Sequence, residues 1–132
     1  MNEETTALIA YRLERAREAL DEARLLLNAN HGNATVNRLY YACFYAVSAL
    51  LLADGRSTSK HTHLRSLLHR DYVKPGHVPQ EMGKHFDLLF DSRQQSDYAD
   101  LVVFQPDEIA SWMDRTEHFI NHVAGLIENR ME

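Results

Sequence analysis

The sequence predicts an all-α protein, an antiparallel up-and-down bundle of four long helices plus a short helix. Apolar residues recur with helical spacing along almost the whole chain, and proline and glycine interrupt that spacing between the helical segments. The period of two that a half-buried strand requires is suggested only by LVVF at 101–104, which is too short and has no partner strand to form a sheet.

The first two predicted helices differ in kind. The first ends near residue 27 and carries a single apolar stripe, formed by Leu13, Ala16, Leu20, Ala23 and Leu27. The segment NANHGN at 28–33 ends it, and we expect Gly32 to be the residue that breaks the helix. The second helix, about 34–53, is apolar on most of its circumference, so we expect the other helices to cover it.

The remaining helices are bounded by loops and prolines. DGRSTS at 54–59 is a loop, and a short helix begins at about Ser59 and is closed by KPGH at 74–77. Pro79 stands where a first-turn proline belongs, so the fourth helix follows it and runs to about Gln95. A second proline start, QPDEI at 105–109, opens the last helix.

Length and composition fit one soluble domain over residues 1–132, with 45% apolar and 25% charged residues. The net charge of −5 does not favour a protein that binds nucleic acid by bulk electrostatics. One cysteine, Cys43, excludes an internal disulfide and a multi-cysteine zinc site. The N-terminus lacks a signal pattern and the longest apolar run, AVSALLLA at 46–53, is short for a membrane span, so we expect a cytoplasmic protein with no membrane contact.

The apolar second helix contains one charged residue, Arg38. Tyr41 and Tyr45 follow it at i+3 and i+7, so the three side chains form a polar seam on that helix. Arg38 either reaches solvent from near the helix start or pairs with a carboxylate inside the bundle. Asp91 and Asp97 are the candidates for that carboxylate.

His61 stands at the start of the short helix. The positive end of a helix disfavours imidazolium, which leaves a neutral ring that can accept a proton; the alternative is an exposed or capping residue. His118 and His122 share one face of the last helix at the i, i+4 spacing that metal sites use, but no acidic residue joins them there. We therefore expect a solvated face and neither a metal nor a cofactor.

Four stretches together resemble one family. NRLYYACFYAVSALL (37–51), SKHTHL (59–64), DYVKPG (71–76) and FDSRQQSDYADL (90–101), in this order and spacing, resemble the HEPN proteins of bacteria and archaea. The resemblance covers about residues 5–128. More specifically, the stretches resemble one branch of the family, in which the last stretch reads Arg, Gln, two variable residues, Asp, Tyr. It implies a helical bundle that commonly dimerises and pairs with a minimal nucleotidyltransferase (MNT) as a toxin–antitoxin couple.

The resemblance also implies a site. In the toxic members of the family, an arginine and a histidine from each subunit cut RNA in a cleft along the dimer axis, without metal. In some, the antitoxin transfers AMP to a tyrosine just beyond that histidine. Arg93 matches the family arginine, whereas Tyr98 falls where the nuclease histidine stands. Arg38, Tyr41 and His61 match positions that are characteristic of the branch.

Two functions are compatible with this pattern. The first is a dimeric, metal-independent toxin ribonuclease with Arg93, His61 and Asp97 as candidate catalytic residues. Tyr98, with an ordinary pKa near ~10, is a poor base, so His61 takes that role if the short helix packs beside the end of the fourth. The second is a non-catalytic module that binds a nucleotide or a nucleotidyltransferase. Its candidate binding or modification residues are Arg38, Tyr41 and Tyr98, with Tyr98 as the AMP acceptor.

Overall fold

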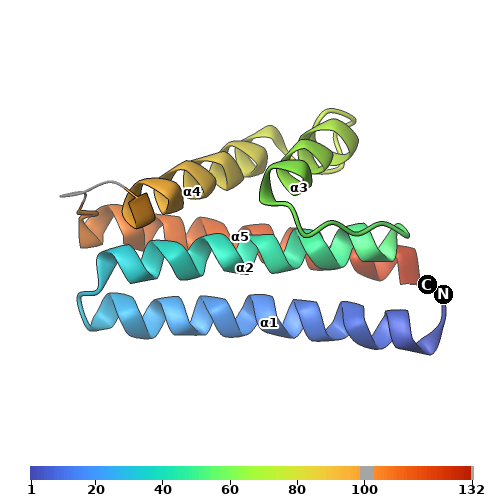
Figure 1. Ribbon diagram of the computed structural model, residues 1–132, viewed down its shortest axis with the longest axis horizontal. Helices are drawn as coiled ribbons and strands as arrows, with labels where there is room; N and C mark the ends of the chain where they lie inside the picture. Colours follow the sequence, from blue (N-terminus) through green and yellow to red (C-terminus); the bar gives the residue numbers. More distant parts are fainter. Residues whose placement is uncertain (99–102, 132) are drawn as a thin grey trace.

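The computed structural model of the protein describes residues 1–98 and 103–131, without the side chains of Asp97 and Tyr98. In this part of the chain the elements are α1 (Glu3–Asn28), α2 (Gly32–Ala53), α3 (His61–Leu68), a π-helical turn η1 (His69–Val73), α4 (Gln80–Tyr98) and α5 (Pro106–Met131) (Figure 1). The described residues form no strand. The predicted all-α fold class is confirmed.

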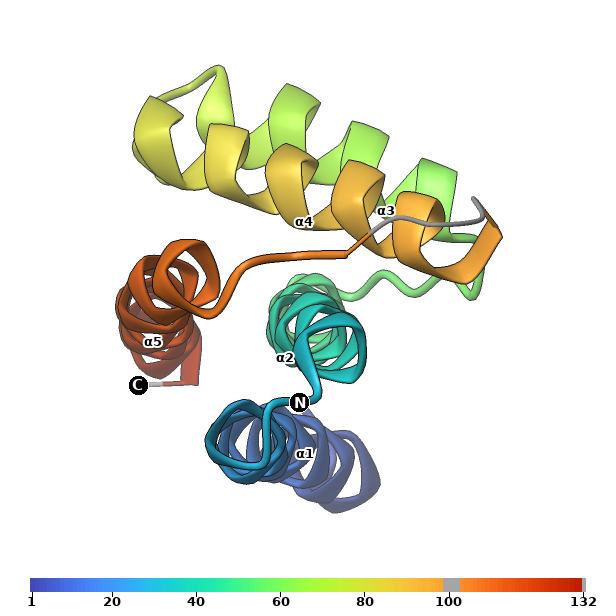
Figure 2. The same ribbon diagram turned by 90° about the vertical axis from the view of Figure 1, so that its left-hand side faces the viewer.

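The helices form two layers. α1, α2 and α5 lie alongside one another, and α3 and α4 lie across them as a second layer (Figures 1 and 2). α2 contacts each of the other four α-helices, which confirms its predicted central place. By length and composition α2 would also pass as a membrane span, with a mean hydropathy of 1.3, but 67% of that stretch is buried inside the fold. The centre of a helical bundle requires the same apolar composition.

The turn between α1 and α2 differs from the prediction. Asn30, not Gly32, adopts the left-handed backbone conformation, with φ of 63°. Gly32 is the first residue of α2, and a Cβ placed on it would lie 2.8 Å from the carbonyl oxygen of Phe104. The prediction that Gly32 breaks the first helix is therefore wrong: the glycine is needed because the segment before α5 passes against it.

In the second layer the short helix begins at His61 rather than at about Ser59 and ends before KPGH as predicted, whereas the fourth helix is longer than predicted. α3 begins at His61 and continues directly into η1, where the Lys74 N–H bonds to the carbonyl of His69. Gly76, with φ of 92°, turns the chain toward α4. α4 ends at Tyr98 rather than near Gln95, so Arg93 lies within the helix and not at its end.

Candidate functional site

Tyr40 is the centre of a cluster of polar and aromatic side chains on α2. Its side chain is fully buried, and its ring lies 5.8 Å from the rings of Phe86 and Phe90 of α4. Its hydroxyl lies 2.7 Å from Nδ1 of His61. A buried phenol needs such a partner, because an unsatisfied hydroxyl in the core is costly. Burial of Tyr40 raises the pKa of its hydroxyl, which is therefore neutral at physiological pH.

Arg93 reaches this cluster from α4. Its Cζ lies 5.3 Å from the ring centroid of Tyr40 and 5.3 Å from that of Tyr41. Both distances suit a cation held over aromatic faces. Because the two tyrosines are adjacent in sequence, a single turn of α2 provides both of the rings that contact the guanidinium.

His61 reaches the same two tyrosines from α3. Its ring stacks on Phe44, with the centroids 4.4 Å apart, and lies 5.8 Å from the ring of Tyr41. Partial burial lowers the pKa of His61, and the positive charge of Arg93 lowers it further. Both effects favour the neutral ring at physiological pH, and the role of His61 as a proton acceptor stays a prediction.

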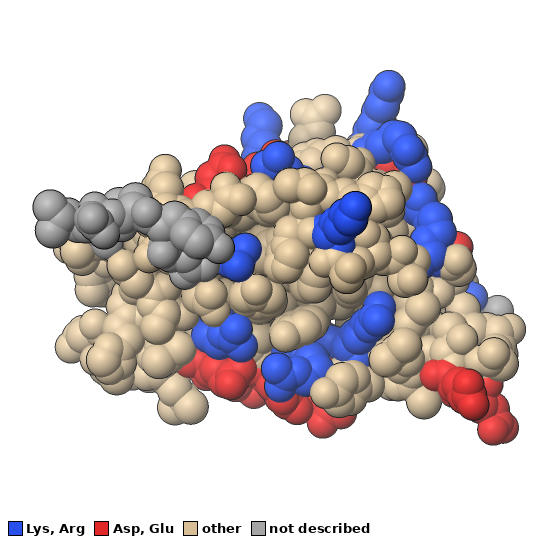
Figure 3. Space-filling model, viewed as in Figure 1, with Lys and Arg blue, Asp and Glu red and all other residues tan. Residues whose placement is uncertain are grey.

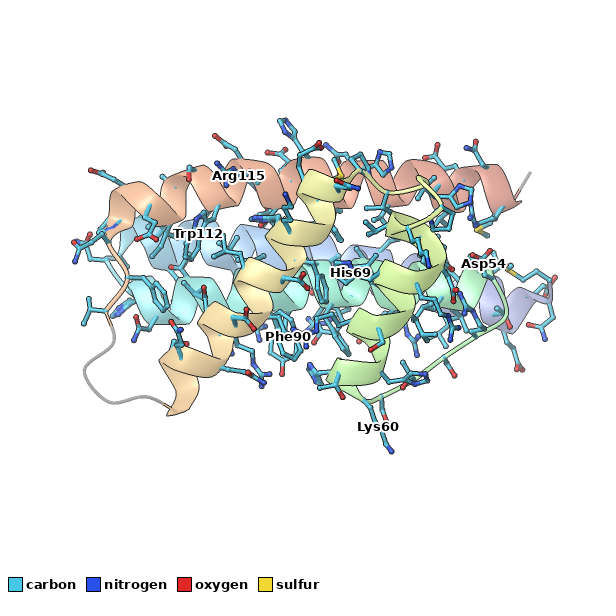
Figure 4. All side chains as sticks on the ribbon, turned by 90° about the horizontal axis from the view of Figure 1, so that it is seen from above. Asp54, Lys60, His69, Phe90, Trp112 and Arg115 are labelled. Carbon is cyan, nitrogen blue, oxygen red and sulfur yellow. The ribbon has the colours of Figure 1, made fainter. Side chains whose placement is uncertain are left out.

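The second layer brings these groups together. α3 packs against α4, as the ribonuclease hypothesis required, and Phe90 of α4 lies between the two helices (Figure 4). Arg65 of α3 crosses this contact: its Cζ lies 4.1 Å from the ring centroid of Phe90, and its guanidinium lies 3.8 Å from the carboxylate of Asp91. Arg65 was not among the residues that the sequence analysis identified.

Arg38 lies next to the cluster but pairs differently from the prediction. Its Cζ is 5.1 Å from the ring centroid of Tyr41, and its guanidinium is 3.6 Å from the carboxylate of Glu22 on α1. Asp91 instead faces Arg65. The prediction that Asp91 balances Arg38 is wrong, because α1 covers this side of α2 whereas Asp91 is on the side of α4 that faces α3. The other candidate, Asp97, has a side chain outside the described residues, as has Tyr98.

Two other groups of histidines have different surroundings. His118 is exposed on α5, as predicted, and so is Arg115 beside it. His122, predicted on the same solvated face, is partly buried and donates a hydrogen bond to the carbonyl of His77. His85 of α4, which the sequence analysis did not identify, is only 5% exposed and lies 2.9 Å from the hydroxyl of Thr116. Burial lowers the pKa of His85 to about 4, with a smaller contribution from the charge of Arg115.

The site is thus a guanidinium and a neutral imidazole held on two tyrosines where α2, α3 and α4 meet. The HEPN domain family model matches residues 9–126, so the chain belongs to the HEPN domain family. A relative from Thermotoga maritima named "UPF0332 protein" is 43% identical over 98% of this chain and 97% of its own length.

More distant relatives carry a functional name. A protein of Methanocaldococcus jannaschii named "Putative toxin" is 25% identical over 83% of this chain and 74% of its own length. Another with the same designation from that organism is 30% identical over 74% of this chain and 70% of its own. The crystal structure of TT1696 from Thermus thermophilus has a TM-score of 0.74, with 20% identity over 89% of this chain and 97% of that one. That likeness shows a shared fold.

Proposed function

We propose that this protein is a metal-independent ribonuclease of the HEPN toxin type that acts as a homodimer. The observation that carries the proposal is that Arg93 and His61, from different helices, meet on Tyr40 and Tyr41. The resemblance to the toxic HEPN proteins supplies the reaction class, and the relatives named "Putative toxin" support it.

The chemistry requires one cation and proton transfer at two oxygens. A base removes the proton of the ribose 2′-hydroxyl, and the 2′-oxygen attacks the adjacent phosphorus. The bond from phosphorus to the 5′-oxygen breaks, and an acid gives that oxygen a proton, which leaves a 2′,3′-cyclic phosphate and a 5′-hydroxyl. Arg93 stabilises the charge on the pentavalent phosphorus through two parallel N–H donors. His61 is the base.

The partner of His61 suits this role. A hydroxyl can donate to Nδ1 or accept from it, so the Tyr40 contact of 2.7 Å permits either tautomer of the ring. With the proton on Nδ1, Nε2 holds the lone pair that a base needs. With the proton on Nε2, the same atom can return a proton. A carbonyl partner would fix the proton on Nδ1 in the neutral ring.

Assembly completes the proposal. A single Arg93 on a chain of net charge −5 offers a phosphate little attraction, whereas a two-fold dimer duplicates Arg93 and His61 in one cleft. We further propose an MNT-type nucleotidyltransferase as the antitoxin, with Tyr98 as the residue that receives AMP, and a cytoplasmic location. If light scattering at tens of micromolar protein shows a strict monomer, the proposal that two subunits share one cleft is wrong.

The deciding experiment uses arginine variants. Arg93→Ala should abolish RNA cleavage in vitro and growth arrest on expression, because it removes the cation. Arg70→Ala is the matched control, since Arg70 is an exposed arginine that pairs with Asp71 on η1. Tyr98→Phe should change the rate far less than Arg93→Ala. If the wild type cleaves no RNA and its cognate nucleotidyltransferase with ATP adds AMP to Tyr98, the protein is the binding module and the enzyme proposal is wrong.

A further inference from the structure

A pocket of about 550 Å³ opens directly beside His61. Its walls come from α1, α2 and the loop before α3, and they include His61 and Phe44, whose stacked rings also pack beside the ring of Tyr40. The pocket therefore borders the proposed reaction centre at His61. Its volume lies within the range of about 300–1,000 Å³ that small-molecule sites occupy, which is enough for one nucleotide.

The lining of this pocket combines cations, hydroxyls and aromatic rings. Arg12 and Arg15 of α1 supply the cations, and residues 57–59 of the loop supply three hydroxyl side chains. Tyr11 and Tyr45 supply the rings, and the side chain of Tyr11 is 58% exposed. Although the net charge is −5, Lys and Arg side chains spread across the middle of the face on which the loop crosses α2, with Asp and Glu mainly at its edges (Figure 3).

Arg15 is held in place for this role. Its Cζ lies 5.3 Å from the ring centroid of Tyr45, and its guanidinium lies 2.9 Å from the carboxylate of Glu18, one turn along α1. The Glu18 side chain is 48% exposed, so this is a surface ion pair and contributes little stability. A phosphate oxyanion can therefore compete for Arg15, while the contact with Tyr45 keeps the guanidinium at the pocket.

We propose that this pocket binds the nucleotide next to the cleaved phosphodiester in single-stranded RNA, with Arg12 and Arg15 on its phosphate and Tyr11 or Tyr45 against its base. Single-stranded RNA fits because successive bases stack on aromatic side chains while the backbone follows cationic ones. The strand then passes from Arg93 and His61, over Phe44, into the pocket. The inference rests on the proposed ribonuclease function and names where its substrate extends.

Binding can be measured without cleavage. A fluorescent hexamer of 2′-O-methyl RNA lacks the attacking hydroxyl, so its anisotropy reports affinity alone. The double change Arg12→Ala with Arg15→Ala should weaken binding by about 10-fold or more, the effect of removing charge-assisted hydrogen bonds. The dependence of log K on log salt should become shallower by about 0.7 for each phosphate that the variant no longer neutralises. Tyr11→Ala should weaken binding by about 5-fold or more, because the base has one ring fewer to stack on.

The control is Arg17→Ala, because Arg17 is an exposed arginine of the same helix that bonds the side chain of Asn121 instead of lining the pocket. It should leave affinity unchanged. Equal affinity for the wild type and the double variant, or an equal loss in Arg17→Ala, would overturn the subsite. Pocket-dependent binding with no cleavage of ordinary RNA would support the subsite and overturn the ribonuclease. If the double variant cleaves RNA with the wild-type rate and KM, the ribonuclease is supported and the subsite is overturned.

Discussion

Two histidines, His61 on α3 and His85 on α4, are held in similar ways. The ring of each lies within hydrogen-bond distance of one hydroxyl group, Tyr40 for His61 and Thr116 for His85. Burial is the larger cause that lowers the pKa of each ring. The charge of an arginine lowers it further, Arg93 for His61 and Arg115 for His85. Both rings are therefore neutral at physiological pH.

The hydroxyl partners differ in what they permit. Thr116 donates its own proton to the carbonyl of Trp112 at 2.8 Å, so it can only accept from His85, and the proton of His85 is fixed on Nε2. Nδ1 of His85 has no hydrogen-bond partner among the described residues. Tyr40 can donate to His61 or accept from it, and His61 also lines an open pocket of about 550 Å³.

This comparison separates a structural histidine from a candidate catalytic one more clearly than the direction of the pKa shift does. Both shifts favour a neutral ring, and burial lowers the pKa of the structural histidine, His85, to about 4. A base must also reach the substrate and must be able to exchange its proton. Both rings line a pocket, of about 550 Å³ at His61 and about 230 Å³ at His85. His61 differs in having a partner that permits both tautomers and a ring that is only partly buried, whereas a fixed tautomer and 5% exposure mark His85 as part of the core.

The largest expected effect is on the cleavage rate. His61→Ala should lower kcat for RNA cleavage by about 100-fold or more, the usual contribution of a general base. His85→Ala should leave the rate within about 2-fold but lower the free energy of unfolding by about 2 kcal/mol, because it leaves a cavity and removes a hydrogen bond. Single-turnover cleavage and urea unfolding measure the two quantities. If both variants lose activity in proportion to stability, the distinction between the two histidines is wrong.

The next effect is on acid stability. The folded pKa of His85, about 4, lies below the ordinary value of 6.5, so between these values the unfolded chain binds more protons than the folded one. The free energy of unfolding should therefore fall as the pH falls from 6.5 to 4, by about 3 kcal/mol, and should show no dependence on His85 above 6.5. His85→Gln should remove most of this fall. Urea unfolding at several pH values checks it, and a variant that keeps the full fall contradicts the assignment.

Much of the fold could be predicted because the signals are local. The largely apolar circumference of α2 predicts its central place, and Pro106 begins α5 as expected. The role of Gly32 could not be predicted, because the group that excludes a side chain there is the carbonyl of Phe104, 72 residues further along the chain (104 − 32). Likewise, the partner of Arg38 depends on which helix covers that side of α2.

The candidate site was predicted in part. His61 and Arg93 could be named because resemblance and chemistry both indicated them. Tyr40, which supports both, was missed because it resembles a core residue in an apolar helix. The signal was available: a buried tyrosine on such a helix requires a partner for its hydroxyl. His85 was missed because its partner, Thr116, belongs to the apolar stripe of α5.

A smaller effect should come from Tyr40→Phe. The substitution keeps the ring against Phe86 and Phe90 but removes the hydroxyl that orients His61. The cleavage rate should fall by about 10-fold, less than in His61→Ala, because the stack on Phe44 still holds the imidazole. The pH profile supplies the discriminating readout, since a purely structural role for Tyr40 would leave the apparent pKa of the base unchanged. An unaltered rate and profile would show that Phe44 alone positions the ring.

The smallest effect concerns the two arginines, which should act on one histidine each. Removing a nearby positive charge favours the imidazolium, so Arg93→Ala should raise the pKa of His61 and Arg115→Ala should raise the pKa of His85. Each rise should be less than about 1 pKa unit, because burial is the larger cause in both rings. NMR titration of the histidine Cε1–H resonances measures both values in the same sample. Arg93→Ala should leave His85 unmoved, and Arg115→Ala should leave His61 unmoved. A shift of both rings in either variant would mean that a change of fold, and not the local charge, sets the protonation of the candidate base.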